Sequence, residues 1–233
     1  MGQFVHLTAA DGFAVPAYLA VPAGKAKAGV VVIQEIFGVN SHIQAVADRF
    51  AAQGYLAIAP AMFERVKPGV DLGYNEATMA EGFALKTAAD ALPGAGVLQD
   101  IQAAIDYVAK GSGDNTGLKV GVVGFCWGGL LTWQSACTLS GISAAVPYYG
   151  GGMTAPAELA RQPTCAVMAH FGEKDHYIAL DTVHAFAAAH PGIAVHTYVA
   201  DHGFNCDQRA SHNQSAADLA RERTLAFFAK KLA

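Results

Sequence analysis

A cysteine flanked by glycines lies near the middle of the 233-residue chain, in a pattern typical of a catalytic nucleophile. The run Gly124–Gly128 reads G-x-C-x-G with Cys126 at its centre, after a predicted strand at 118–124 and before a predicted helix at 126–139. Such a strained turn exposes the nucleophile and excludes a Cβ at its glycines. It also places the thiol at the positive end of a helix dipole, which favours a thiolate. A buried structural cysteine is the alternative, but the flanking strand and helix favour a nucleophile.

An acid and an imidazole follow the cysteine, each after a predicted strand. Asp175 follows the strand at 164–171, and His202 follows the strand at 193–199. The carboxyl ends of parallel strands share one edge of a sheet, so these side chains can converge on Cys126. His202 would then take the thiol proton while the acid orients its ring. Asp201 and Glu173 remain alternative orienting acids; an immediate chain neighbour rarely reaches its own histidine, and we favour Asp175.

The elements that must position these residues alternate between short apolar runs and helical periodicity, which predicts an α/β fold with a mostly parallel sheet covered by helices on both faces. We expect one domain over residues 1–233, beginning with a small hairpin at about 3–20 that turns at Asp11-Gly12. Predicted strands are 28–34, 55–60, 118–124, 142–148, 164–171 and 193–199. The first predicted helix follows an N-cap at Ser41. The others are a weaker segment at 74–92, then 97–108, 126–139, one that ends near His190, and 215–231.

Composition excludes several classes of function. The net charge is −4 and the longest basic run is Lys230-Lys231, so nucleic acid is not an expected partner. The apolar stretch Phe13–Gly24 contains two prolines and is too short for a membrane span, which needs ~20 residues, so no membrane association is expected. The four cysteines form no C-x-x-C pair, which indicates free thiols and a cytoplasmic protein.

The chain resembles the dienelactone hydrolase (carboxymethylenebutenolidase) family from about residue 28 to its C-terminus. The matching motifs are Gln34–Asn40, Gly124–Gly129, Tyr148–Gly150, the Gly172-x-x-Asp175-His176 loop and His202–Phe204. The resemblance implies a single-domain α/β-hydrolase fold and a Cys126-His202-Asp175 triad. It also implies hydrolysis of an enol-lactone or activated ester through a thioester, with no metal and no organic cofactor.

The resemblance also implies roles for residues around the triad. Glu35 would contact the resting thiol and shift when substrate enters, although it could instead be a solvated loop charge. The backbone N–H groups of Ile36 and Trp127 would form the oxyanion hole. Substrate contacts are expected from three aromatic residues and one arginine, namely Phe37, Tyr148, Phe204 and Arg209.

The sequence departs from the family where substrate carboxylates are bound. Cys206 stands where an arginine is expected, and the predicted helix at 74–92 offers Glu81 and Lys86 but no arginine. Losing bidentate guanidinium groups should weaken the capture of an acidic lactone, unless Arg209 turns inward. The expected partner is therefore a small lactone or ester of undetermined charge, acted on by a monomer or weak homodimer.

The nucleophile type narrows the chemistry further. A thiolate is also a good leaving group, so its adducts go forward only when the other group departs easily, as an enolate does. Two other readings remain: a non-catalytic ligand-binding protein on the same fold, or a general esterase for small, non-acidic esters. A metal site built from His170, Asp175, His176, His202 and Cys206 has no familiar ligand spacing, and none is expected.

Overall fold

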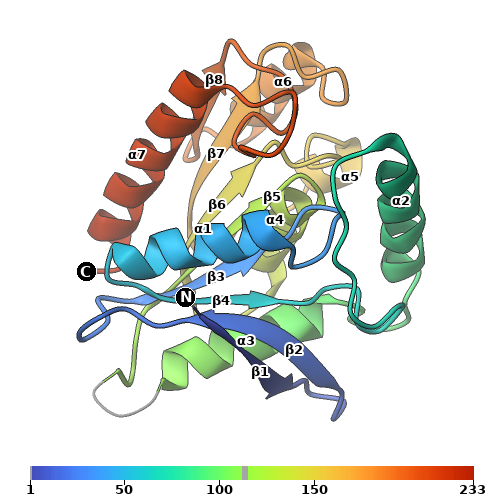
Figure 1. Cartoon of the computed structure of the whole chain (residues 1–233). Helices are drawn as coiled ribbons and strands as arrows, with labels where there is room; N and C mark the ends of the chain where they lie inside the picture. Colours follow the sequence, from blue (N-terminus) through green and yellow to red (C-terminus); the bar gives the residue numbers. More distant parts are fainter. Residues whose placement is uncertain (1, 112–114) are drawn as a thin grey trace.

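A computed structural model describes residues 2–111 and 115–233 as an α/β sandwich around an eight-stranded sheet (Figure 1). The strand order is β1-β2-β4-β3-β5-β6-β7-β8, antiparallel from β1 to β4 and parallel from β4 to β8. The strands are β1 (Gln3–Thr8), β2 (Ala14–Ala20), β3 (Gly29–Ile33), β4 (Leu56–Pro60), β5 (Val120–Phe125), β6 (Ile142–Tyr148), β7 (Ala166–Gly172) and β8 (Ala194–Tyr198). The predicted fold class is confirmed.

Helices cover both faces, with α1 and α7 together on one of them (Figure 1). The helices are α1 (Ser41–Ala52), α2 (Glu76–Asp90), α3 (Leu98–Lys110), α4 (Trp127–Thr138), α5 (Pro156–Leu159), α6 (Leu180–Ala189) and α7 (Gln214–Lys231). No helix within the described ranges is long and apolar enough to cross a membrane.

The two larger apolar cores of the described residues follow from the two-residue period of the strands. Val30 and Val32 of β3 pack in the core beneath α1 and α7, whereas Val31 and Ile33 pack in the core beneath α3. A strand buried on both faces is apolar throughout, which is why the central strands read as continuous apolar runs. Because β3, β5, β7 and β8 run parallel, their carboxyl ends lie at one common edge of the sheet.

The observed elements depart from the sequence expectations at their ends and in one loop. Asn40, not Ser41, caps α1, because its side chain accepts the Ile43 N–H. The loop predicted around Pro156 contains the short helix α5, which begins at this proline. The weakly periodic segment at 74–92 does form a helix, α2, which a capping box between Asn75 and Thr78 begins.

Candidate active site

Cys126 occupies a strained turn between β5 and α4. Its φ is 56° and its ψ is −118°, a backbone conformation that a residue with a Cβ rarely adopts. A Cβ on Gly124 would collide with the carbonyl of Gly128, and a Cβ on Gly128 would collide with the carbonyl of Gln34. The Cys126 N–H donates to the Tyr148 carbonyl (3.1 Å), which ties the turn to β6. Cys126 is partly exposed and lies at the N-terminus of α4.

His202 and Asp175 are paired beside this turn. The His202 ring donates from Nδ1 to Asp175 Oδ2 over 2.7 Å, and both side chains are almost fully buried. The other oxygen of Asp175 accepts the backbone N–H groups of Tyr177 and Ile178, at 2.9 and 3.2 Å. This carboxylate is therefore fixed by its own loop and in turn fixes the imidazole, the arrangement a general base requires.

The two alternative acids have other partners. Asp201 accepts the backbone N–H of His202 (2.6 Å) and pairs with the His176 ring (3.0 Å). Glu173 accepts the hydroxyl of Thr197 (2.9 Å) on the neighbouring strand β8. Of the three acids, Asp175 is the one that lies on the His202 ring.

The surroundings of His202 favour its charged form. Burial lowers the pKa of His202, but the charge of Cys126 and the hydrogen bonds with Asp175 and Cys126 outweigh burial and raise the pKa from 6.5 to about 10. The imidazole can therefore hold a proton at neutral pH and deliver it to a leaving group. Protonated imidazole beside sulfur is the pairing that activates a cysteine nucleophile.

Glu35 lies just beyond the end of β3 and is 1% exposed. Its Oε1 accepts a hydrogen bond from Arg209 Nη1 at 3.0 Å, while Oε2 has no partner among the described residues. Arg209 turns inward against Gly203, the residue after His202, and its guanidinium lies 5.8 Å from the centre of the Phe37 ring. The loop after His202 thus supplies an arginine to the site, although from a position three residues beyond Cys206.

The two expected oxyanion donors lie on adjoining segments. Trp127 is the first residue of α4, so its N–H has no acceptor within the helix. Its indole stacks on Phe63 (5.0 Å between centroids) and donates to Asp90 Oδ1 (2.9 Å), which anchors the turn. The segment with Ile36 passes close enough to α4 that Gly128 leaves no room for a Cβ beside residues 33 and 34.

The expected aromatic contacts occupy different surroundings. Phe37 is buried beneath Arg209 and packs against Tyr74 (4.6 Å). Tyr148 is buried and exchanges a hydrogen bond with Thr224 of α7 (2.6 Å), and Phe204 is fully buried among tyrosines. Tyr148 and Phe204 therefore lie in the core on the same face of the sheet as α1 and α7.

Three aromatic residues near the site were not singled out from the sequence. Tyr149 has a positive φ of 35°, its ring lies 5.1 Å from His202, and its buried hydroxyl has no partner among the described residues. Burial, then the charges of Glu35 and Cys206, raise the pKa of Tyr149 well above its usual value. The ring of Tyr177, 52% exposed, lies 5.1 Å from His202 and 6.4 Å from Phe83 of α2. The rings of Tyr177 and Phe83 form an open aromatic wall beside the His202 imidazole.

Glu81 and Cys206, named above where the family has arginines, lie in different surroundings. Glu81 of α2 is exposed and pairs with Lys67 (2.7 Å). Cys206 is fully buried beside Glu35, and burial followed by the charge of Glu35 raises the pKa of Cys206 to about 12. Neither side chain can bind a carboxylate as an arginine would.

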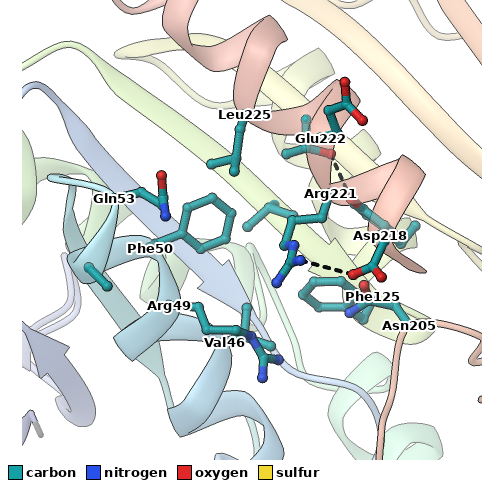
Figure 2. A pocket seen from close by; sticks show the side chains of 14 residues that line it. Val46, Arg49, Phe50, Gln53, Phe125, Asn205, Asp218, Arg221, Glu222 and Leu225 are labelled. Carbon is teal, nitrogen blue, oxygen red and sulfur yellow. Dashed lines mark hydrogen bonds and ion pairs between the residues drawn. The ribbon is translucent and has the colours of Figure 1, made fainter. Parts of the chain in front are cut away.

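A cavity lies away from the triad, between α1 and α7. It has a volume of about 480 Å³, with an apolar floor that includes Phe50 and Phe125 and a rim that includes Arg49 and Arg221 (Figure 2). Arg221 is paired with Asp218 (2.9 Å) in this rim. None of the triad residues lines it, so the cavity is separate from the catalytic edge.

Comparison with known proteins agrees with this geometry. Residues 15–232 match the family model described as "Dienelactone hydrolase family". A carboxymethylenebutenolidase of Pseudomonas putida is 33% identical over 231 residues, covering 97% of this chain and 95% of the relative. A protein of Synechocystis sp., provisionally named as the same enzyme, is 36% identical over 239 residues, covering 94% and 92%.

Solved structures give the same result. A crystal structure from Klebsiella pneumoniae, provisionally described as a dienelactone hydrolase, has a TM-score of 0.82 and 31% identity, covering 98% of each chain. An esterase of Pyrococcus furiosus has a TM-score of 0.69 at 13% identity, covering all of this chain and 94% of that one, and it shares the fold alone. Sequence match, strand order and nucleophile turn agree, and the chain belongs to the dienelactone hydrolase family of α/β-hydrolases.

Proposed function

We propose that the protein is a cysteine-dependent hydrolase of enol-lactones and activated carboxylic esters, acting through a thioester on Cys126. The observation that carries this proposal is the strained turn at Cys126 together with His202, whose ring is fixed by Asp175 at 2.7 Å and whose pKa is raised by the neighbouring Cys126. The family membership supports the reaction class, because relatives that share most of the chain are named carboxymethylenebutenolidases.

In the first half of the reaction, the sulfur of Cys126 attacks the ester carbonyl and forms a tetrahedral oxyanion. The N–H groups of Trp127 and Ile36 stabilise that charge. The C–O bond to the leaving group then breaks, and the proton held by His202 passes to the departing oxygen. In the second half, His202 takes a proton from water, hydroxide attacks the thioester carbonyl, and the carboxylic acid departs as Cys126 recovers its thiolate.

The substrate class follows from how easily the Cys126 thiolate and the alcohol part of the ester each leave the tetrahedral adduct. A thiolate departs more readily than a simple alkoxide, so an alkyl ester or amide would return the adduct to starting material. An enolate or aryl oxide competes with sulfur, and its C–O bond can break first. This argument favours enol-lactones and aryl esters as substrates.

We propose that a substrate carboxylate contributes little to binding here. Arg209 is already paired with Glu35 at 3.0 Å, and α2 offers Glu81 at its exposed face. A free, buried guanidinium would be needed for bidentate binding of an acidic substrate. The aromatic wall of Tyr177 and Phe83 fits an unsaturated, uncharged ring better.

The test compares turnover of a carboxylated dienelactone, neutral enol-lactones and p-nitrophenyl esters by wild type and two cysteine variants. Cys126→Ala should lose nearly all hydrolysis, on the order of 10⁴-fold or more, whereas Cys165→Ala, at a partly exposed cysteine outside the site, should keep it. Mass spectrometry of quenched wild type should detect an acyl adduct on the peptide that contains Cys126. Full turnover by Cys126→Ala would refute the proposal.

A further inference from the structure

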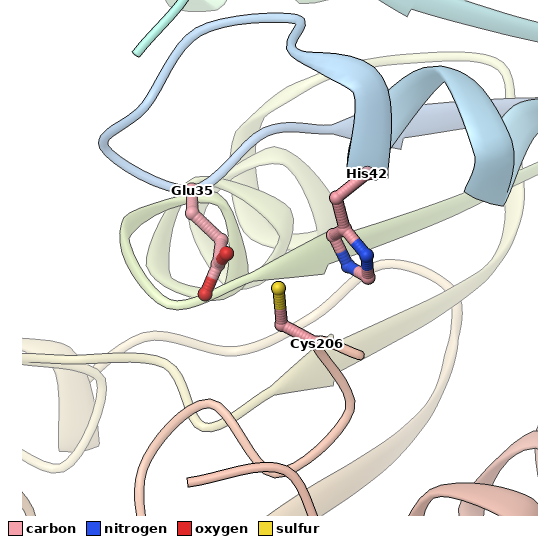
Figure 3. A group of neighbouring side chains, drawn as sticks. All are labelled: Glu35, His42 and Cys206. Atoms are coloured by element: carbon pink, nitrogen blue, oxygen red, sulfur yellow. The ribbon is translucent and has the colours of Figure 1, made fainter. Parts of the chain in front are cut away.

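A second group of reactive side chains lies beneath the catalytic edge. Glu35, His42 and Cys206 come from the end of β3, the first turn of α1 and the loop that precedes α7, and one ligand atom of each lies within 4.8 Å of the others. Figure 3 shows the sulfur of Cys206 pointing between the Glu35 carboxylate and the His42 ring. We infer that these three residues form a binding site for a thiophilic divalent cation of the Zn²⁺ class.

Two buried polar atoms of the cluster are the second observation behind this inference. His42 is fully buried, and its Nε2 has no hydrogen-bond partner in the described chain; the same is true of Oε2 of Glu35, which is 1% exposed. A buried polar atom left unpaired costs about 1–3 kcal/mol, so such atoms call for an explanation. A cation bound by both atoms would satisfy them together.

In both His42 and Glu35, the other polar atom of the side chain already has a hydrogen-bond partner, as is usual for residues that bind a metal. His42 Nδ1 pairs with Asp207 Oδ1 at 2.9 Å, which places the ring proton on Nδ1 and leaves the Nε2 lone pair free. Arg209 holds Oε1 of Glu35 and leaves Oε2 free. A carboxylate behind a ligating histidine is the usual support for bound zinc, since it fixes the ring and raises its basicity.

The donor types select the ion. Sulfur, imidazole nitrogen and carboxylate oxygen together suit Zn²⁺ or Co²⁺, whereas Mg²⁺ and Ca²⁺ prefer oxygen donors throughout. Around a tetrahedral zinc ion such atoms lie about 3.5 Å apart, so ligand atoms that now lie within 4.8 Å of one another need move only about an ångström. The Cys206 thiol gives its proton to solvent on binding, and thiolate and carboxylate then neutralise the two charges of the ion. A fourth position remains for water.

The test adds Co²⁺ to the reduced, chelator-treated full chain and follows the thiolate-to-cobalt charge-transfer band in the near ultraviolet. Wild type should bind one ion with this band and with the visible absorption of a tetrahedral site, and Zn²⁺ should displace it and raise the Tm. Cys206→Ser should abolish the band. Cys126→Ala and Cys165→Ala should keep it, because neither residue belongs to the cluster.

Asp207→Asn provides a second variant that should not disturb folding, because this side chain is 51% exposed. It should weaken cobalt affinity about 10-fold or more while the band persists at saturation. Absence of the band in folded wild type would overturn the inference and leave a neutral thiol–carboxylate contact in its place. A band that survives Cys206→Ser, or one that vanishes in Cys126→Ala, would equally overturn it by assigning the ion to another thiol.

Discussion

Asp175 and Asp201 both lie within reach of His202, yet they contact different parts of it. Asp175 accepts from the ring, whereas Asp201 accepts from the backbone N–H and pairs with His176. Asp175→Asn would remove the charge that stabilises the imidazolium and favour the wrong tautomer, so kcat should fall by about 10²–10⁴-fold. Asp201→Asn should change kcat by less than about 10-fold. Steady-state kinetics of both folded variants decide, and equal losses would contradict the assignment.

The raised pKa of His202 predicts an alkaline limit to activity. The proton that passes to the leaving oxygen is present below the folded pKa of about 10 and is lost above it, so kcat/KM should fall as pH rises through 10. The sign for stability is the same. A pKa raised above 6.5 contributes stability that is complete below pH 6.5 and is lost as pH rises through 10.

The charge of Cys126 is the largest influence that raises the pKa of His202. Cys126→Ser removes this sulfur, so the pKa of His202 should move down from its raised value. NMR titration of the ring protons measures this change directly. An unchanged midpoint would mean that sulfur and imidazole do not interact.

Sequence reasoning ranked these residues but could not decide among them. Strand ends place Asp175, Asp201 and His202 at one edge, but which carboxylate contacts the ring depends on the conformation of the two loops. The positive φ of Tyr149 leaves no composition signal, because a strained non-glycine residue looks like any other in a sequence. The Glu35–His42–Cys206 cluster joins parts of the chain up to 171 residues apart, with no motif spacing.

At the scale of elements, β3 and α4 approach each other closely because Gly128 has no side chain. A Cβ at this position would strike the backbone of residues 33 and 34. Gly128→Ala should therefore lower the free energy of unfolding by about 1–3 kcal/mol and displace the oxyanion donors. Urea unfolding measures the first effect, and kcat the second.

Gly151 offers a matched control, since nothing lies within 4 Å of a Cβ built there. Gly151→Ala should change the free energy of unfolding by less than about 1 kcal/mol. Equal destabilisation by both alanines would show that close packing at β3 and α4 is not the cause.

The elements themselves were largely predictable. Apolar runs with a period of two or with no polar breaks predicted the parallel strands, because burial on one or both faces imposes those patterns directly. The N-cap of α1 and the short helix α5 were not predicted. Both depend on a few local hydrogen bonds, such as that from the Ile43 N–H to Asn40, and competing turn geometries use the same residue types.

At the scale of the whole molecule, Arg65 joins the N-terminal hairpin to α3. It pairs with Asp11 in the hairpin turn (2.7 Å) and with Asp100 of α3 (2.7 Å), while its guanidinium lies 4.3 Å from the centre of the Phe13 ring. Asp100 is 1% exposed, and burial raises its pKa despite this partner. The arginine thus fastens the N-terminal hairpin to the helical layer.

Arg65→Met should cost about 3 kcal/mol or more at pH 7, because it leaves a buried carboxylate uncompensated, and hydrogen exchange should accelerate in β1 and β2 first. Arg221→Met, at an exposed pair, should cost less than about 1 kcal/mol. In wild type, the lowered pKa of Asp11 contributes stability above pH 3.8 that is lost as pH falls toward 2. Unchanged exchange in the hairpin of Arg65→Met would contradict this role.

The backbone conformation of Cys126 lowers the stability of the fold at the position that the proposed reaction needs. With φ at 56° and ψ at −118°, any side chain there costs about 1–3 kcal/mol, and glycine escapes most of that cost. Cys126→Gly should thus be catalytically dead yet melt at a higher temperature than Cys126→Ala, which retains a Cβ. If hydrolysis were no longer selected for, thermostability alone would favour replacing Cys126 by glycine. A cysteine kept at this position in related chains would therefore indicate that the reaction is still in use.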